Sequence, residues 1–203
     1  MRHATRWEDK TTADPNHSTW YVERFRRMVA DGADLAGEAR MIDALIPRGS
    51  RVLDAGCGPG RVGAELAARG HLVTGVDVDP VLIEAARADH PRSEWLLGDL
   101  AELDLPARGV LEPFDVAVAA GNVMTFLAPG TEVEVLSRLA AHVRADGRVV
   151  LGFGAGRGYA FEDFFADLDR AGLRLEAAFS TWDLRPFTST SDFVVAVTAP
   201  ASA

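Results

Sequence analysis

The chain has 203 residues, of which 48% are apolar and 25% are charged, and its formal net charge at pH 7 is −9. This length and composition predict a single domain over 1–203 with a sizeable core. No apolar run approaches the roughly 18 residues that would suggest a membrane span. The acidic balance disfavours a nucleic-acid partner. One cysteine and an N-terminus without an apolar leader favour a cytoplasmic protein.

The first part of the chain is polar and then helical. Residues 1–17 include the breaker Asp14-Pro15-Asn16 and are predicted to be mobile. Two segments with apolar residues at helical spacing follow, 19–30 and 35–46. Residues 18–46 are therefore predicted to form a helical cap, long enough to fold over the mouth of a ligand site.

From residue 51 the pattern alternates between strands and helices, which is typical of a parallel sheet covered on both faces. The predicted strands are 52–55, 72–76, 95–97, 114–120, 148–153, 173–182 and 193–198. The predicted helices are 61–69, one beginning at Pro80, 132–143 and 161–171. Asp146-Gly147 is predicted to turn into the fifth strand, because Asp-Gly favours turns.

The last two predicted strands have no helix between them. Their loop of about ten residues is too short for the usual helical crossover, so 173–182 and 193–198 should form an antiparallel hairpin. The sequence therefore predicts an α/β fold over 51–198. It is a doubly wound, Rossmann-like sheet of seven strands, six parallel and one reversed at the sheet edge.

The strongest functional signal is the stretch 52–60. An apolar strand ends at Asp54, a turn with three alternating glycines follows, and a helix begins at Arg61. Such a turn presents backbone amides at a helix N-terminus to a nucleotide-like ligand. Asp77 ends the next apolar run, where an acid is placed to accept hydrogen bonds from both hydroxyls of a ribose.

The glycine spacing separates this turn from two better-known motifs. A dinucleotide fingerprint has a glycine or alanine three positions after its second glycine, where this chain has Arg61. A Walker A loop requires Gly-Lys followed by Ser or Thr, which is absent. No second domain is predicted that would hold a hydride acceptor. These features disfavour a nicotinamide-dependent reductase.

The chain resembles the class I S-adenosylmethionine-dependent methyltransferases over roughly residues 18–198. Four motifs carry the resemblance, each at the expected strand: 54–60, 75–77, 98–100 and 114–119. The resemblance implies the strand order 3-2-1-4-5-7-6 with strand 7 antiparallel, in agreement with the predicted hairpin. It also implies S-adenosylmethionine as the cofactor.

The resemblance further implies where the methionine and ribose parts of the cofactor would bind. Gly56 and Gly58 would lie beneath the methionine, and Asp54 would lie near its ammonium group. Asp77 would hold the ribose. Asp54 has an equally weighted alternative, a structural acid that accepts hydrogen bonds from amides of its own loop.

For the adenine, the resemblance implies three contacts. Val78 would pack on the ring, Asp99 would accept a hydrogen bond from the amino group, and the amide of Leu100 would lie nearby. A carboxylate suits an exocyclic amine, and apolar walls suit the faces of a purine. The alternative for Asp99 is a turn acid that follows Gly98.

The loop 121–127 after the fourth strand would face the reacting methyl group. It resembles the corresponding loop of glycine N-methyltransferase-like enzymes, with Gly121 at the cofactor. Asn122 is a candidate catalytic residue that would position the acceptor or the cofactor's ammonium. Its alternative is a turn or cap residue.

Three further residues are candidates for the site. Arg157, in the loop after the fifth strand, could clamp a carboxylate or phosphate of the acceptor, and Tyr159 could line the pocket. The alternative for Arg157 is an exposed loop arginine. Tyr21 of the cap could close over the cofactor in a positioning role, or pack in an apolar stripe.

These features predict an enzyme that transfers the methyl group of S-adenosylmethionine to a small soluble acceptor, at nitrogen or oxygen, by in-line displacement. Alignment and exclusion of water would dominate such catalysis. One alternative is an RNA or protein methyltransferase on the same fold, and another is a non-catalytic S-adenosylmethionine-binding protein. The five histidines lack metal-ligand spacing, so no catalytic metal is expected. The oligomeric state stays open.

Overall fold

The computed structural model describes residues 2–201. The strands are β1 (Arg51–Ala55), β2 (Leu72–Asp77), β3 (Glu94–Leu97), β4 (Phe114–Ala119), β5 (Val143–Gly154), β6 (Leu173–Phe179) and β7 (Phe193–Pro200). The helices are α1 (Arg6–Ala13), α2 (His17–Ala30), α3 (Gly37–Leu45), α4 (Arg61–Ala68), α5 (Pro80–Asp89), α6 (Glu132–His142) and α7 (Phe161–Arg170). Short 3₁₀ turns are η1 (Leu100–Glu102), η2 (Pro106–Arg108) and η3 (Val123–Thr125).

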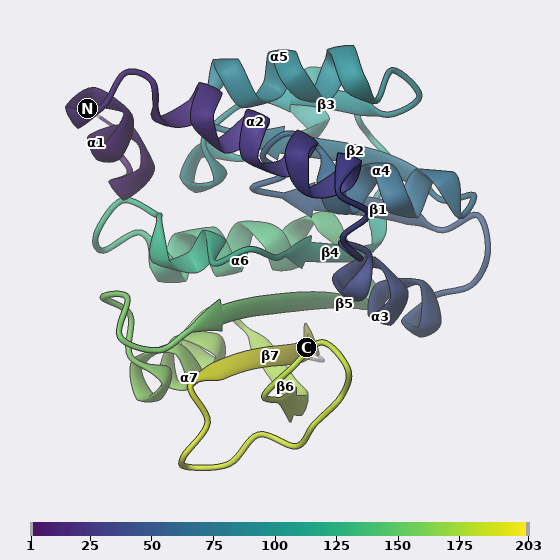
Figure 1. Ribbon diagram of the computed structural model, residues 1–203. Helices are drawn as coiled ribbons and strands as arrows, with labels where there is room; N and C mark the ends of the chain where they lie inside the picture. Colours follow the sequence, from purple (N-terminus) through teal and green to yellow (C-terminus); the bar gives the residue numbers. More distant parts are fainter. Residues whose placement is uncertain (1, 202–203) are drawn as a thin grey trace.

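Within residues 2–201 the strands form a seven-stranded sheet in the order β3-β2-β1-β4-β5-β7-β6 (Figure 1). β7 pairs antiparallel with both β5 and β6, and the other neighbours are parallel. The predicted fold class and strand order are confirmed. The reversed strand lies inside the sheet, however, and β6 is the edge strand, because the hairpin inserts its second strand next to β5.

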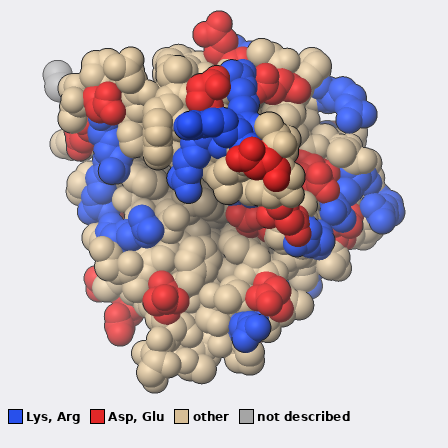
Figure 2. Space-filling view, in the orientation of Figure 1, with Lys and Arg blue, Asp and Glu red and all other residues tan. Residues whose placement is uncertain are grey.

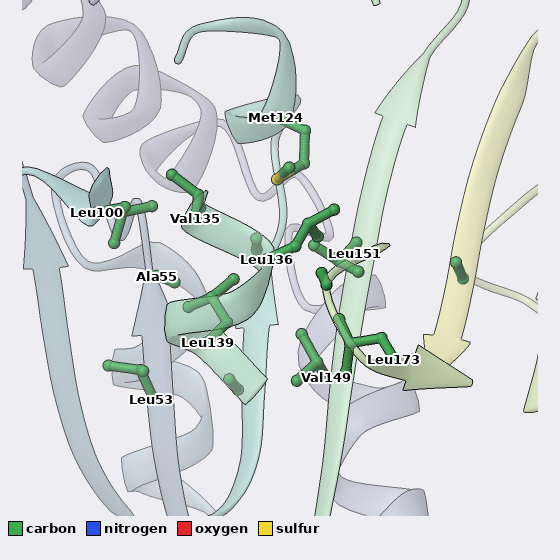
Figure 3. Packing of buried hydrophobic residues seen from close by; sticks show 14 of the residues in the cluster. Leu53, Ala55, Leu100, Met124, Val135, Leu136, Leu139, Val149, Leu151 and Leu173 are labelled. Atoms are coloured by element: carbon green, nitrogen blue, oxygen red, sulfur yellow. The ribbon is translucent and has the colours of Figure 1, made fainter. Parts of the chain in front are cut away.

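One face of the sheet packs against α6 and α7. Val135, Leu136 and Leu139 project from α6 onto Leu53 of β1 and Leu151 of β5, and all five side chains are buried (Figure 3). Their spacing along α6 places the three residues on one side of the helix. Burial of each such side chain contributes about 1.5–3 kcal/mol. β4 contributes Phe114, Ala117 and Ala119 to the same cluster, so the loop between β4 and α6 is attached to the core at both ends.

The opposite face packs against α3, α4 and α5. Ile42, Leu66 and Ile83, one from each helix, lie in a cluster with strand residues such as Val52 and Val116. Because both faces of these strands are covered, their sequences are nearly continuous apolar runs. Outside this layer, α2 packs along α5 and α1 lies at the edge where the strands of the central sheet end (Figure 1).

The N-terminal segment corrects one sequence prediction. Residues 1–17 are predicted to be mobile, but the structure folds α1 there. The Thr5 hydroxyl accepts a hydrogen bond from the amide of Glu8, and the Glu8 carboxylate accepts one from the amide of Thr5, at 3.1 and 2.8 Å. This reciprocal pair is a capping box, which starts a helix. The amides of Arg6 and Trp7 donate to carbonyls of the loop after β4, at 3.4 Å each.

The start of β5 also differs from its prediction. Asp146-Gly147 is predicted to turn into a strand at 148, but β5 begins at Val143, which pairs with Phe114. The register then shifts before Arg148, so the dipeptide lies in an irregular part of a longer strand. Such a bulge bends a strand without ending it.

The cap and the core are joined by a largely buried ion pair between α3 and α4. Both guanidinium nitrogens of the Arg61 fork donate to the carboxylate of Glu38, at 2.8 and 2.5 Å. One of them also donates to the carbonyl of Leu35 at 2.7 Å. The two charged side chains are 19% and 17% exposed. Removal of one partner would leave the other charge buried without compensation.

We therefore expect Glu38→Ala to lower the free energy of unfolding by about 2 kcal/mol, somewhat less than for a fully buried pair. The matched control is Glu23→Ala, because Glu23 forms an exposed pair with Arg26. That change should cost at most about 0.5 kcal/mol. Urea denaturation measures both values, and equal losses in the two variants would contradict the assignment.

Candidate functional site

A cavity lies at the carboxyl ends of β1, β2 and β4, beneath the N-terminal helices. The turn after β1 forms its floor, the ends of β2 and β3 form one wall, and α1 and α2 contribute the roof. The sequence-predicted residues that line it are Tyr21, Asp54, Gly56, Gly58, Asp77, Val78, Asp99, Leu100 and Gly121. Asn122, Arg157 and Tyr159 are not part of its wall.

The floor of the cavity requires glycine for steric reasons. Gly56 has a φ of 74°, in the left-handed region, and a Cβ at this position would stand 2.5 Å from the side chain of Val123. At Gly58, also left-handed, a Cβ would meet the ring of Tyr21 at 3.8 Å. The loop after β4 and the cap therefore close directly on the backbone of the glycine turn.

The carboxylate of Asp77 joins the ends of β1 and β2. One oxygen accepts a hydrogen bond from the amide of Gly58 at 2.8 Å, and the other accepts from the amide of Asp79 at 2.9 Å. Burial raises the pKa of Asp77 to about 6, although these amide bonds oppose the shift. A carboxylate has about four acceptor positions, so both oxygens can still accept from a ligand in the cavity.

Asp54 has a structural contact as well as a place in the cavity wall. One of its oxygens accepts from the amide of Gly63, in the first turn of α4, at 2.8 Å. This bond is structural, but its donor belongs to α4, whereas the structural alternative predicted a donor in the loop itself. Burial raises the pKa of Asp54 to about 7, because the amide bond and the more distant Arg61 compensate the charge only in part.

The wall near β3 is apolar and ends in a carboxylate. Leu100 is buried and Val78 is half-buried. Asp99 accepts from the amide of Ala101 at 2.9 Å with one oxygen and from the guanidinium of Arg2 at 2.8 Å with the other. The contact with Ala101 caps η1, which agrees with the predicted turn role. The contact with Arg2 was not predicted from the sequence.

An aromatic roof covers the cavity. The ring of Trp7 lies edge-on to Tyr21 and Phe126, with centroids 5.3 and 5.5 Å apart. Its indole nitrogen donates to Asp79 at 2.7 Å, which ties α1 to the start of α5. Burial raises the pKa of Tyr21, so its phenol stays neutral at physiological pH, as a positioning role requires.

Sequence reasoning did not identify Thr5 and Trp7 as cavity residues, and it placed Phe126 near the site only as part of the loop 121–127. A signal for the first two was present, because Thr5-Arg6-Trp7-Glu8 has the spacing of a capping box. That pattern predicts an ordered helix in the segment assigned as mobile. The loop that contains Phe126 was expected at the site, but the contact of its ring with Trp7 depends on how that loop folds over the sheet edge.

The structure corrects the predicted position of Tyr159. It was predicted to line the pocket, but its side chain is buried in the core and its ring is stacked on Phe153 at 5.5 Å. Its hydroxyl donates to the carboxylate of Asp167 in α7 at 3.0 Å. A buried phenol needs a hydrogen-bond partner, and this tyrosine has one away from the cavity.

Asn122 and Arg157 lie outside the cavity wall but next to its rim. Asn122 has a φ of 68°, and its side-chain oxygen accepts from the amide of Gly154 at 2.8 Å. This bond joins the loop after β4 to the end of β5. Arg157 is exposed in the loop that follows β5.

Comparisons with known proteins assign the family. A profile described as "Methyltransferase domain" matches residues 52–147. The solved structure of a TehB-like SAM-dependent methyltransferase from Corynebacterium glutamicum is 48% identical with a TM-score of 0.86, and the match covers 92% of this chain and 100% of that chain. The magnesium-protoporphyrin O-methyltransferase of Rhodobacter capsulatus is 37% identical over 137 residues, 63% of this chain and 55% of that protein.

Solved structures of lower sequence identity share the fold with this chain, and the comparison with them concerns the fold alone. The magnesium protoporphyrin IX methyltransferase of Synechocystis, solved with bound SAM, is 21% identical with a TM-score of 0.67, and the match covers 95% of this chain and 97% of that chain. The chain spans about half the length of the first curated relative, or less for others that it matches.

The chain belongs to the class I S-adenosylmethionine-dependent methyltransferases, and S-adenosylmethionine is the cofactor of this family. The family and cofactor predictions are thus confirmed. The acceptor is not settled by the relatives, because their names include a porphyrin, a ribosomal-protein and an rRNA methyltransferase.

Two features are absent from residues 2–201, the part of the chain that the structure describes. In this part of the chain, no helix has the length and apolar character needed to cross a membrane. The same residues contain no group of three or more His, Cys, Asp and Glu side chains that could hold a metal ion.

The raised pKa values of Asp54 and Asp77 predict a pH-dependent stability. Both lie above the ordinary value of 3.8, so the folded protein binds these protons more tightly than the unfolded chain. Their contribution to the free energy of unfolding is full only below the ordinary value of 3.8, and it is lost progressively as the pH rises from there through about 6 and 7. Asp54→Asn should make this decline shallower, by at most about 1.4 kcal/mol per pH unit.

Urea denaturation across this pH range measures the effect. Acids with lowered pKa values, such as Glu8 at about 2, change the stability in the opposite direction up to their ordinary value of 4.5, so the slopes are compared between about pH 5 and 7. Asp31→Asn is the control, because Asp31 is exposed in the turn after α2. If Asp54→Asn and the control show the same slope, the buried carboxyl does not titrate in this range.

Proposed function

We propose that this protein transfers the methyl group of S-adenosylmethionine to a small soluble acceptor, at nitrogen or oxygen, with the cofactor bound in the cavity beneath α1 and α2. The observation that supports this most strongly is the position of Asp77, which ends β2 and bonds to the glycine turn after β1. Ligands of doubly wound sheets bind at the carboxyl ends of strands, where the strand order reverses. In this sheet that point lies between β1 and β4.

The cavity fits the methionine and ribose parts of the cofactor. Asp77 would accept from the ribose hydroxyls with its remaining lone pairs. Asp54 would lie near the ammonium group, and Gly56 and Gly58 would pass beneath the methionine. Burial raises the pKa of both carboxyls, which means that the protein alone compensates their charges only in part. A cationic ligand would supply the missing compensation.

The remaining wall fits the adenine and the reacting end. Val78 and Leu100 would flank the purine, and Asp99 would accept from its amino group beside the existing bond from Arg2. Gly121 would approach the cofactor from the loop after β4. The lining of the cavity therefore offers a partner to each part of the cofactor.

The bound cofactor would supply an activated methyl group on a positively charged sulfur. The residues of the chain would exclude water and align the acceptor, through the roof formed by Trp7, Tyr21 and Phe126. Tyr21 would act by position, as part of this roof, and burial raises the pKa of its phenol further above the ordinary value of 10. Asn122 would hold the loop after β4 in place through Gly154.

The charge of the protein favours a small acceptor, present in the cytoplasm, over RNA. Binding to nucleic acid draws its affinity from many phosphate contacts, whereas this chain has a net charge of −9. The roof also narrows access to the transferred methyl group.

The ribose assignment is tested with Asp77→Ala. Loss of two hydrogen bonds to a charged acceptor, at about 1.5–3 kcal/mol each, should weaken S-adenosylmethionine binding by about 100-fold or more. Calorimetry measures the affinity, and circular dichroism verifies that the variant is folded. Asp31→Ala serves as the surface control. Unchanged affinity in folded Asp77→Ala would refute the assignment.

Turnover is tested by formation of S-adenosylhomocysteine with a panel of small amines, phenols and carboxylates. We expect turnover with at least one member of the panel and no stimulation by RNA. Tight cofactor binding without turnover on any acceptor would favour a non-catalytic binder. Stimulation by RNA alone would favour the rival methyltransferase class.

A further inference from the structure

The loops that follow β4 and β5 meet at a junction where two side chains, Asn122 and Arg157, have hydrogen-bond donors without a partner in the part of the protein that the structure describes. The side-chain oxygen of Asn122 already accepts from the amide of Gly154 at 2.8 Å. Its amide nitrogen is therefore the part of the side chain that is left for another partner, and an amide nitrogen can only donate. This junction lies next to Gly121 and Val123, which line the cofactor cavity.

Arg157 lies over the same junction. Its Nε is 3.2 Å from the position that a Cβ on Gly154 would occupy, and the oxygen of Asn122 is 3.5 Å from that position. The side chain of Arg157 therefore folds back over Gly154, with its Nε next to the side chain of Asn122. Among residues 2–201, the guanidinium of Arg157 has no ion-pair or hydrogen-bond partner and is exposed, so it is left to water or to a ligand.

Arg6 reaches the junction from the roof. Its guanidinium donates to the carbonyls of Thr125 and Gly158, at 3.4 and 3.3 Å, and so spans the loops after β4 and β5. Both partners are neutral, and both bonds are long. Lys10, one helical turn further along α1, lies 5.9 Å from the ring centroid of Phe126.

These three cations form a local basic patch on an acidic protein. Figure 2 shows Lys and Arg side chains gathered at the left of the molecule, over α1 and the region below it. Phe126, beneath Lys10, lines the cofactor cavity, so the patch borders the rim that an acceptor would cross. Local positive charge of this kind attracts anions despite a negative net charge.

We infer that the methyl acceptor carries an anionic group, a carboxylate or a phosphate, and that Arg157 and Arg6 bind this group with the amide nitrogen of Asn122 as a further donor. The inference rests on the proposed function and names its substrate class. Guanidinium groups match the oxygens of carboxylate and phosphate in pairs. A nucleic acid would require a longer basic surface.

The test uses small anions as probes of the ¹⁵N-labelled protein saturated with S-adenosylhomocysteine. Sodium phosphate and sodium acetate are titrated at constant ionic strength, with acetamide as the neutral probe. At least one anion should produce saturable chemical-shift changes at the amides of 121–127 and 154–158, and acetamide should produce none. Whichever anion saturates identifies the chemistry of the group.

Variants show whether the shifts report on Arg157. Arg157→Gln should weaken binding of the effective anion by about tenfold, the loss expected for a charge-assisted hydrogen bond. Arg157→Lys should restore part of the affinity, because it keeps the charge. The matched control is Arg92→Gln, because Arg92 is exposed in the turn between α5 and β3; this change should alter the affinity less than twofold.

Two results would overturn the inference. One is the absence of saturable shifts with both anions, and the other is an equal effect of Arg157→Gln and Arg92→Gln. The titration is repeated without S-adenosylhomocysteine, so that its outcome does not depend on cofactor binding. Failure to bind S-adenosylhomocysteine would instead contradict the proposed function, whereas cofactor binding without anion binding would contradict only the acceptor class.

Discussion

The site depends on the buried carboxylate of Asp77 and the two amides that it accepts from. These bonds hold the turn after β1 against the start of the loop after β2. The second amide belongs to Asp79, whose own side chain caps α5 and accepts from Trp7 and Ser18. One polar network therefore runs from the glycine floor of the cavity to its aromatic roof. Each buried acceptor in it has a donor, which is what makes burial of these carboxylates tolerable.

The N-terminal segment belongs to the site as much as the sheet does. Its backbone bonds to the loop after β4, Trp7 bonds to Asp79, and Arg2 bonds to Asp99. The segment thus touches both halves of the sheet edge at which the strand order reverses. The same segment brings Arg6 and Lys10 to the rim, so that it contributes both apolar cover and positive charge.

Local patterns predicted most of the fold because their physical causes are local. Asp79-Pro80 marks a helix start through a side-chain cap and a missing amide hydrogen, and the structure shows this cap at Val81. The ten-residue connection between the last strands excluded a crossover helix, and the antiparallel pairing agrees. The capping box at Thr5 is equally local, but the prediction for this segment used only its polar composition and the breaker at Asp14-Pro15-Asn16.

The sequence by itself determined the order and type of the elements from α2 onward, the glycine turn and the acids at the ends of β1, β2 and β3. Each of these depends on chain stiffness, side-chain period or a requirement for left-handed φ. Only the tertiary structure decided that Tyr159 lies in the core, that Trp7 and Phe126 roof the cavity, and that Arg6 bridges the loops after β4 and β5. Those placements depend on contacts between segments far apart in the chain, which no local pattern encodes.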